Sequence, residues 1–256
     1  MGWEEILEKA GSVLKEESRL IVLPPRGRAV FVGDTHGDLD ASQQVIRRFL
    51  KKSHVLVFLG DYVDRGSFSK ENLLFLLQVK QEHPEDLFLL AGNHEGYPVR
   101  KFYPANFWES LTGKEFETLG RLVRRFPLTA TSGNGILALH GALPDLSSLE
   151  EVDRIEPGDP QWERVLWGDF VESREDRMED WGGRPQFGRP YFERLMERYR
   201  KKILLRSHQP LAPMVMFDRR CVTLFTSSAY VSNRMVAVVD LDREIRNAED
   251  VTFEKI

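Results

Sequence analysis

The sequence predicts an α/β fold built on parallel strands, and two observations indicate it. Short apolar runs end abruptly in glycine and polar residues, and these runs have the length and composition of buried strands. In addition, Asp34, Asp61 and Asn93 each follow such a run and recur about every 30 residues, which is the length of one strand–helix–strand unit. A core in which helices alternate with parallel strands explains both observations.

The first half of the chain contains the predicted strands and helices that produce this 30-residue repeat. Apolar residues at helical spacing predict an amphipathic helix over residues 3–18, after which Pro24, Pro25 and Gly27 interrupt the chain. The strands are predicted at Ala29–Val32, Val55–Leu59 and Leu87–Leu90, and the helices between them at Ala41–Leu50 and Lys70–Gln81.

The second half is less regular and predicts a second, mixed sheet. Its apolar runs are Ile136–Leu139, Ile203–Leu205, Val222–Phe225 and Met235–Leu241. Residues 172–190 are rich in charge and are broken by glycine and proline, so we expect a long ordered loop there. No linker composition separates the halves, and we expect residues 1–256 to form a single domain.

Composition excludes several classes of protein. The net charge of −4 lacks the basic footprint of nucleic-acid binders, so no nucleic-acid partner is expected. Cys221 is the single cysteine, which excludes an internal disulfide and a zinc site built from several thiolates. No apolar run approaches ~18 residues and no signal peptide is visible, so we expect a cytoplasmic protein without a membrane partner.

Five segments with metal-binding side chains each follow a predicted strand. They are Gly33–Gly37, Gly60–Gly66, Gly92–Glu95, His140–Gly141 and Arg206–Gln209. In an open α/β sheet, ligands gather outside the carboxyl ends of the strands, so these segments are expected to meet at one rim. Their glycines suit tight turns in which the backbone approaches a ligand closely.

The side chains of these segments predict a centre with two metal ions. The candidate ligands are Asp34, His36, Asp61, Asn93, His140 and His208. Oxygen and imidazole donors suit divalent manganese, iron or zinc, and we expect manganese first. Six ligands exceed the three that hold a single open catalytic ion, whereas two ions bridged by one carboxylate use them all.

The remaining polar residues are suited to phosphate chemistry. Arg65 and Arg184 can grip phosphate oxygens through two parallel hydrogen bonds. His94 can donate a proton to a departing oxygen, and Asp64 can orient that imidazole and keep it protonated. Hydrolysis of a phosphate ester is the reaction that this set of groups favours.

The segments Gly33–Gly37, Gly60–Gly66 and Gly92–Glu95 resemble the signature blocks of the PPP family of phosphoprotein phosphatases, within the calcineurin-like metallophosphoesterases. The resemblance extends from about Ala29 to Val239. It implies a sandwich of two mixed β-sheets flanked by helices, in four layers α/β/β/α.

The resemblance also implies roles for single residues. One metal ion would be held by Asp34, His36 and Asp61, and the other by Asp61, Asn93, His140 and His208. His94 would be the general acid, paired with Asp64, and the phosphate would be bound by Arg65, Arg184 and Asn93. Tyr230 resembles a tyrosine placed over the site and would also bind the phosphate, and Asp169 belongs to a Trp-x-Asp block near the metals.

The expected function is hydrolysis of phosphoserine and phosphothreonine, with phosphotyrosine as a further substrate, by direct attack of a hydroxide that bridges the two metals. The partner would be a phosphoprotein or phosphopeptide, and the oligomeric state stays open. The first alternative is a dinucleoside tetraphosphate hydrolase of the same superfamily. A more remote one is a scaffold without catalytic activity, which the retention of His94, Asp64 and Arg65 disfavours.

Overall fold

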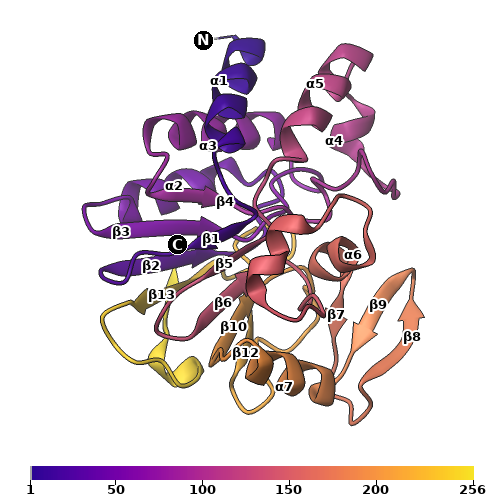
Figure 1. Cartoon of the computed structure of the whole chain (residues 1–256). Helices are drawn as coiled ribbons and strands as arrows, with labels where there is room; N and C mark the ends of the chain where they lie inside the picture. Colours follow the sequence, from indigo (N-terminus) through magenta and orange to yellow (C-terminus); the bar gives the residue numbers. More distant parts are fainter. Residues whose placement is uncertain (1) are drawn as a thin grey trace.

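The computed structural model describes residues 2–256, and its centre is a sandwich of two β-sheets (Figure 1). The six-stranded sheet has the order β1 (Leu20–Val22), β5 (Thr129–Thr131), β6 (Ile136–Leu139), β10 (Ile203–Arg206), β12 (Cys221–Thr223) and β11 (Val215–Met216). The five-stranded sheet has the order β14 (Thr252–Lys255), β13 (Met235–Asp240), β2 (Arg28–Val32), β3 (His54–Phe58) and β4 (Leu87–Leu89).

The central strands are apolar on both faces because each face is covered. In β2, Ala29 and Phe31 pack into the core between the two sheets, whereas Val30 and Val32 belong to the cluster that contains the helices. All four side chains are fully buried. This explains why the strands appear in the sequence as continuous apolar runs rather than as alternating ones.

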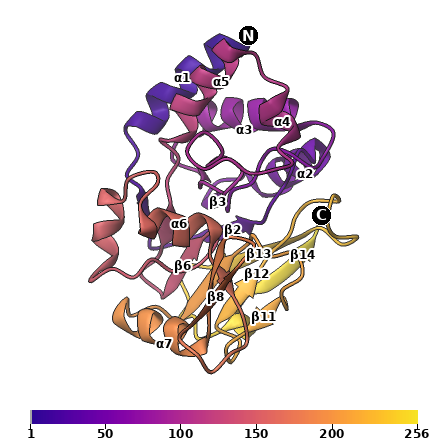
Figure 2. The same ribbon diagram turned by 90° about the vertical axis from the view of Figure 1, so that its right-hand side faces the viewer.

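Helices cover the outer faces of the sandwich (Figures 1 and 2). Above the five-stranded sheet lie α1 (Trp3–Lys15), α2 (Leu39–Phe49), α3 (Ser69–Glu82), α4 (Asn106–Glu109) and α5 (Gly113–Val123), and α6 (Pro160–Trp167) and α7 (Arg189–Arg198) lie beside the other sheet. Side chains set several of their boundaries. Asp38 caps α2 by accepting a hydrogen bond of 3.1 Å from the Ala41 amide, and Thr112 and Glu115 form a capping box at the start of α5.

The strand directions bring the predicted ligand segments to one rim. β2, β3 and β4 run parallel, and so do β6, β10 and β12. Asp34 and Phe225 form an isolated bridge that joins the ends of the two sheets. The predicted parallel core and mixed sheets are therefore confirmed, with strand boundaries within one or two residues of those expected.

The expectation of a long loop over residues 172–190 is wrong. This segment contains a β-hairpin formed by β8 (Arg177–Trp181) and β9 (Arg184–Phe187), and α7 begins at Arg189. With the two-residue β7 (Asp169–Phe170), the hairpin forms a third, small sheet. Four of the five side chains of β8 are exposed, so no apolar alternation marked the strand.

None of the helices within residues 2–256 combines the length and the apolar character needed to cross a bilayer.

A buried lysine fastens α3 to the five-stranded sheet. The Lys80 side chain is 0% exposed, and its ammonium donates hydrogen bonds to the carbonyl oxygens of Pro84 (2.7 Å) and Leu87 (2.6 Å). It also pairs with Glu17, which follows α1. Burial lowers the pKa of Lys80 and raises the pKa of Glu17, so both charges depend on this pairing.

We therefore expect Lys80→Met to lower the free energy of unfolding by about 3–5 kcal/mol, because it leaves Glu17 buried without a partner. Lys70→Met is the matched control, since Lys70 lies on the same helix but forms an exposed pair with Glu115. The control should lower the free energy of unfolding by less than about 1 kcal/mol. Urea unfolding followed by circular dichroism measures both, and equal losses in the two variants would contradict the structural role of Lys80.

Candidate metal centre

Three of the five ligand segments form strained turns at the rim of the sandwich. His36, Asp61 and His208 all have positive φ angles, of 41°, 56° and 74°. Side chains other than glycine seldom adopt this region, and such strain concentrates at functional sites. The turns thus hold these side chains in positions that the backbone would not otherwise favour.

Glycine permits two of these turns to touch. A Cβ atom on Gly92 would lie 2.2 Å from Asp61 Oδ1 and 2.4 Å from the Asp61 backbone nitrogen. Gly60 has a φ of 103°, and a Cβ there would lie 2.5 Å from the Gly92 nitrogen. Any side chain at either position would push the segment that carries Asn93 away from Asp61.

The first group of converging donors consists of Asp34, His36 and Asp61. His36 Nε2 lies 3.6 Å from Asp34 Oδ2 and 3.5 Å from Asp61 Oδ2. The other ring nitrogen, Nδ1, bonds the Val63 carbonyl oxygen at 2.9 Å. A carbonyl oxygen only accepts, so Nδ1 carries a proton, and Nε2 is the nitrogen that faces the two carboxylates and could bind a metal ion.

The second group consists of Asp61, Asn93, His140 and His208. His140 Nε2 lies 3.1 Å from Asn93 Oδ1, 3.1 Å from His208 Nδ1 and 3.4 Å from Asp61 Oδ2. His140 Nδ1 bonds the Leu59 carbonyl oxygen at 2.8 Å, which leaves Nε2 as an acceptor. Acceptor atoms thus face one another at short range.

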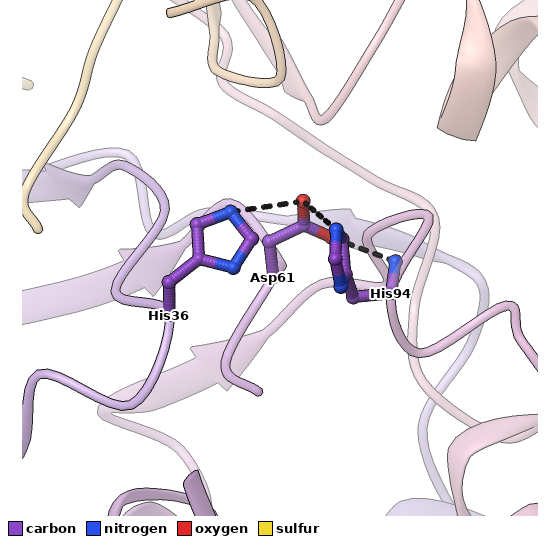
Figure 3. A group of neighbouring side chains, drawn as sticks. All are labelled: His36, Asp61 and His94. Carbon is purple, nitrogen blue, oxygen red and sulfur yellow. Dashed lines mark hydrogen bonds and ion pairs between the residues drawn. The ribbon is translucent and has the colours of Figure 1, made fainter. Parts of the chain in front are cut away.

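The two groups share one atom, Asp61 Oδ2. The other carboxylate oxygen of Asp61, Oδ1, accepts a hydrogen bond of 2.8 Å from the His94 amide. Oδ2 is therefore the oxygen that faces both His36, as Figure 3 shows, and His140. This arrangement agrees with the predicted bridging role of Asp61.

Charge at the site favours a cation. Burial alone would lower the pKa of His36, but its contacts with Asp34 and Asp61 raise that pKa to about 9. The pKa of His140 is also raised, since Asp61 and Asp34 outweigh its burial. The carboxylates therefore draw positive charge into the site, and buried acceptors this close need a shared cation. The residues fit two divalent ions.

His94 lies beside the first group in a fixed orientation. Its Nδ1 is 2.6 Å from Asp64 Oδ2, and Asp64 Oδ1 accepts a hydrogen bond of 2.7 Å from the Phe107 amide. His94 Nε2 points toward Asp61 Oδ2 at 3.9 Å, and the rings of His36 and His94 flank that carboxylate (Figure 3). Burial lowers the pKa of His94 although Asp61 and Asp64 act to raise it, and the contact with Asp64 fixes the orientation of the ring.

The predicted phosphate-binding residues surround the same cavity of about 540 Å³. Arg65 Nε donates to the Tyr230 hydroxyl at 3.0 Å, and Arg65 NH1 donates to the Pro104 carbonyl oxygen at 2.7 Å. The Tyr230 ring lies 5.1 Å from the His36 ring, between centroids. Arg184 also lines the cavity, and its NH1 lies 3.7 Å from Asp169 Oδ1. The structure thus brings all the predicted site residues together.

Three residues without a role in the sequence analysis support the site. The Glu95 carboxylate accepts hydrogen bonds from the amides of Asp61 (2.8 Å) and Tyr62 (2.9 Å), which fixes the strained turn. Ser207 Oγ accepts from the Asp34 amide at 2.9 Å. The fully buried Arg206 donates to the Gly141 carbonyl oxygen at 2.6 Å and so ties the His140 turn to the His208 turn. All three lie within two residues of a predicted ligand, and this proximity in the sequence was the available signal.

A comparison of the sequence with profiles of known protein families agrees with the geometry of the rim. The sequence profile of calcineurin-like phosphoesterases matches residues 27–211. The chain belongs to the calcineurin-like phosphoesterase family. The matched range includes every member of the two donor groups, as well as His94 and Asp64. Family membership and the two donor groups together support a dependence on divalent metal ions.

Two curated calcineurin-like relatives carry names of protein phosphatases. One is a probable serine/threonine-protein phosphatase of Encephalitozoon cuniculi, 28% identical over 246 residues, which are 90% of this chain and 53% of the relative. The other is serine/threonine-protein phosphatase T of Saccharomyces cerevisiae, 28% identical over 248 residues, with coverage of 90% and 48%. The chain spans about half the length of these relatives.

Solved structures confirm the calcineurin-like fold. A Saccharomyces cerevisiae serine/threonine phosphatase with similarity to human phosphatase PP5 superposes with a TM-score of 0.84 at 23% identity, over 99% of this chain and 88% of the other. A cold-active protein-tyrosine phosphatase of a Shewanella species gives 0.59 at 18% identity, covering 95% and 84%. A putative diadenosine tetraphosphatase gives 0.55 at 17%, covering 93% and 98%.

Proposed function

We propose that this chain is a metal-dependent phosphomonoesterase that hydrolyses phosphoserine and phosphothreonine in proteins, with phosphotyrosine as a further substrate. The observation that carries the proposal is the convergence of two donor groups on Asp61 Oδ2, next to the His94–Asp64 pair. Residues 1–256 would act as one phosphatase domain.

The proposed metal ligands divide as the sequence analysis expects. Asp34, His36 and Asp61 would hold one ion, and the remaining side chains together with Asp61 would hold the other; these are Asn93, His140 and His208. When bound, the ions would offset the charge of the phosphoryl group and lower the pKa of a coordinated water. Manganese is the first candidate for both, with iron or zinc as alternatives.

Asp169 supports the assignment of His208 as a ligand. His208 Nε2 and Asp169 Oδ1 are both buried without a hydrogen-bond partner among the described residues, and they lie 3.4 Å apart. Because a carboxylate accepts, it favours the proton on Nε2 and leaves Nδ1 free to bind a metal ion. Carboxylates orient metal-binding histidines in this way in many proteins.

The other side chains would bind the phosphoryl group and move a proton. Arg65, Arg184 and Asn93 would contact its oxygens, with Tyr230 steadying Arg65 through the hydrogen bond between them. Because Nδ1 of His94 faces Asp64, the imidazolium would deliver its proton from Nε2 to the departing oxygen. The lowered pKa of His94 would make that proton easy to release.

The cavity favours direct attack of water over a covalent intermediate. Its lining contains no serine, threonine or cysteine among the described residues. Cys221 is fully buried, and burial raises the pKa of its thiol to about 12. A hydroxyl or thiol nucleophile of the serine, threonine or cysteine type is thus missing from the described lining, and the aspartates and histidines there are assigned above to the metal ions, to the orientation of His208 or to proton transfer.

The names of the two curated relatives support the choice of phosphoserine and phosphothreonine as substrates. One is named a probable serine/threonine-protein phosphatase, and the other is named serine/threonine-protein phosphatase T. Phosphotyrosine and dinucleoside tetraphosphates are the competing substrates, since proteins with those names share the fold.

We expect the chain, supplied in turn with manganese, magnesium, iron and zinc, to hydrolyse phosphoserine and phosphothreonine peptides. Phosphate release should be highest with manganese and should disappear after chelation. Phosphotyrosine peptides and diadenosine tetraphosphate are the comparison substrates. Faster cleavage of the dinucleotide would overturn the substrate assignment, and no cleavage of any substrate, including p-nitrophenyl phosphate, would favour a scaffold.

A further inference from the structure

The tip of the β8–β9 hairpin lines the candidate cavity, and whereas β9 pairs with β7, β8 and the turn have few attachments to the rest of the molecule. Trp181, Gly182 and Arg184 from this hairpin line the cavity. β8 pairs only with β9, and Figure 1 shows the hairpin outside the two large sheets. The Trp181 side chain is 69% exposed, so the tip has no buried apolar anchor. Arg184 itself is held from one side, by the pairing of β9 with β7 and by the ion pair with Asp169, but the turn that precedes it needs a contact of its own.

A single polar contact joins the tip of the hairpin to the body. Arg100 NH2 donates a hydrogen bond of 2.6 Å to the Gly183 carbonyl oxygen. Among residues 2–256, no other hydrogen bond or ion pair links residues 178–183 to a residue outside the hairpin. Gly182 and Gly183 have φ angles of 59° and 78° and form the tight turn between paired Trp181 and Arg184. Arg100 therefore holds the residue next to Arg184.

Arg100 is itself held in place by two residues of α6, Trp167 and Glu163. Its guanidinium carbon lies 4.7 Å from the centroid of the Trp167 ring, and NH1 lies 3.4 Å from Glu163. Trp167 contacts Phe102 at 5.4 Å between centroids, and Phe102 contacts the His94 ring at 4.6 Å. A guanidinium that stacks on an aromatic face while it donates a hydrogen bond is not replaceable by an ammonium.

We propose that Arg100 is a positioning residue that latches the β8–β9 hairpin against the cavity and thereby sets the place of Arg184. This inference rests on the proposed function for its catalytic consequence, although the latch itself does not. Without Arg100, the two-glycine turn is free to move, and Arg184 loses its fixed distance from Asp169 and from the phosphoryl group. The proposal assigns the effect on catalysis to Arg184, and the experiment below separates it from an effect through the contact of Arg100 with Trp167.

A double-mutant cycle on kcat/KM separates this role from a general structural one. Arg100→Met, Arg184→Met and the double variant are compared for a phosphoserine peptide and for p-nitrophenyl phosphate. We expect Arg100→Met to lower kcat/KM about 10- to 100-fold in the wild-type background, since small displacements of binding groups cost this much. In the Arg184→Met background the loss should shrink to about twofold or less. Equal losses in both backgrounds would overturn the proposal.

Two further variants sharpen the test. Arg100→Lys retains the charge but not the planar fork, so it should restore only part of the activity. Arg177→Met removes an exposed arginine of the same hairpin, whose ion pair with Asp180 lies within β8, and should leave kcat/KM unchanged. Full activity in Arg100→Met, or an equal loss in Arg177→Met, would contradict the latch.

Hydrogen–deuterium exchange on the millisecond scale tests the latch without any catalytic readout. Arg100→Met should exchange faster at residues 178–187 and nowhere else, whereas Arg177→Met should match the wild type. Unchanged exchange in the hairpin, or faster exchange throughout the chain, would refute the latch. If the wild-type chain cleaves no phosphate ester, the proposed function fails, and the exchange result alone decides whether Arg100 fastens the hairpin.

Discussion

Replacing His94 with alanine is expected to lower kcat on phosphoserine peptides by about 10²–10⁴-fold, the usual contribution of a general acid. The expectation follows from the orientation of the ring, which Asp64 holds at 2.6 Å with Nε2 facing the cavity. A serine alkoxide is a poor leaving group and depends on this proton. The nitrophenolate of p-nitrophenyl phosphate leaves readily without it, so the loss on that ester should be far smaller.

The amount of manganese bound by His94→Ala shows whether His94 is a general acid or a metal ligand. His36, Asp61 and His94 offer donor atoms within 4.8 Å of one another, so His94 could in principle hold a metal instead (Figure 3). As a general acid, His94→Ala should retain the metal content of the wild type. Equal losses of activity on both esters, together with loss of metal, would assign His94 to the metal centre and remove it from proton transfer.

Replacing Asp61 with asparagine is expected to weaken both metal sites at once. The substitution keeps the shape of the side chain but removes the charge that both donor groups share at Oδ2. Bound manganese, measured by plasma mass spectrometry after gel filtration, should fall from about two ions per chain to fewer than one, and activity should fall with it. Chelation of the wild type should give the same loss of activity.

Asp34→Asn is the matched control, because Asp34 contacts His36 in the first group but is not a predicted ligand of the second ion. This variant should retain about one ion per chain. If Asp61→Asn retained one ion as well, the two variants would be equivalent and Asp61 would not be a bridging ligand.

The ligand set could be predicted from the sequence because each ligand follows a strand that is buried on both faces. Such strands appear as uninterrupted apolar runs, and a polar residue at the end of one is conspicuous. Asp34 after β2 and His140 after β6 are both of this kind. Parallel pairing then fixes their proximity, since the carboxyl ends of parallel strands share an edge.

The supporting residues could not be predicted, because their roles depend on contacts between distant segments. Lys80 and Arg206 are fully buried charges, whereas charged side chains are ordinarily expected on the surface. Arg100 acquires its role only from the Gly183 carbonyl oxygen, 83 positions along the chain. The β8 strand lacked an apolar pattern since it borders solvent and the cavity rather than a core.

The central claim is that residues distant in the chain converge to hold two cations through a single shared carboxylate. Anomalous diffraction from crystals grown with manganese tests it most directly. The account predicts two peaks that both adjoin the Asp61 carboxylate, one beside His36 and the other beside His140 and His208. A single peak, or two peaks of which only one touches Asp61, would contradict it.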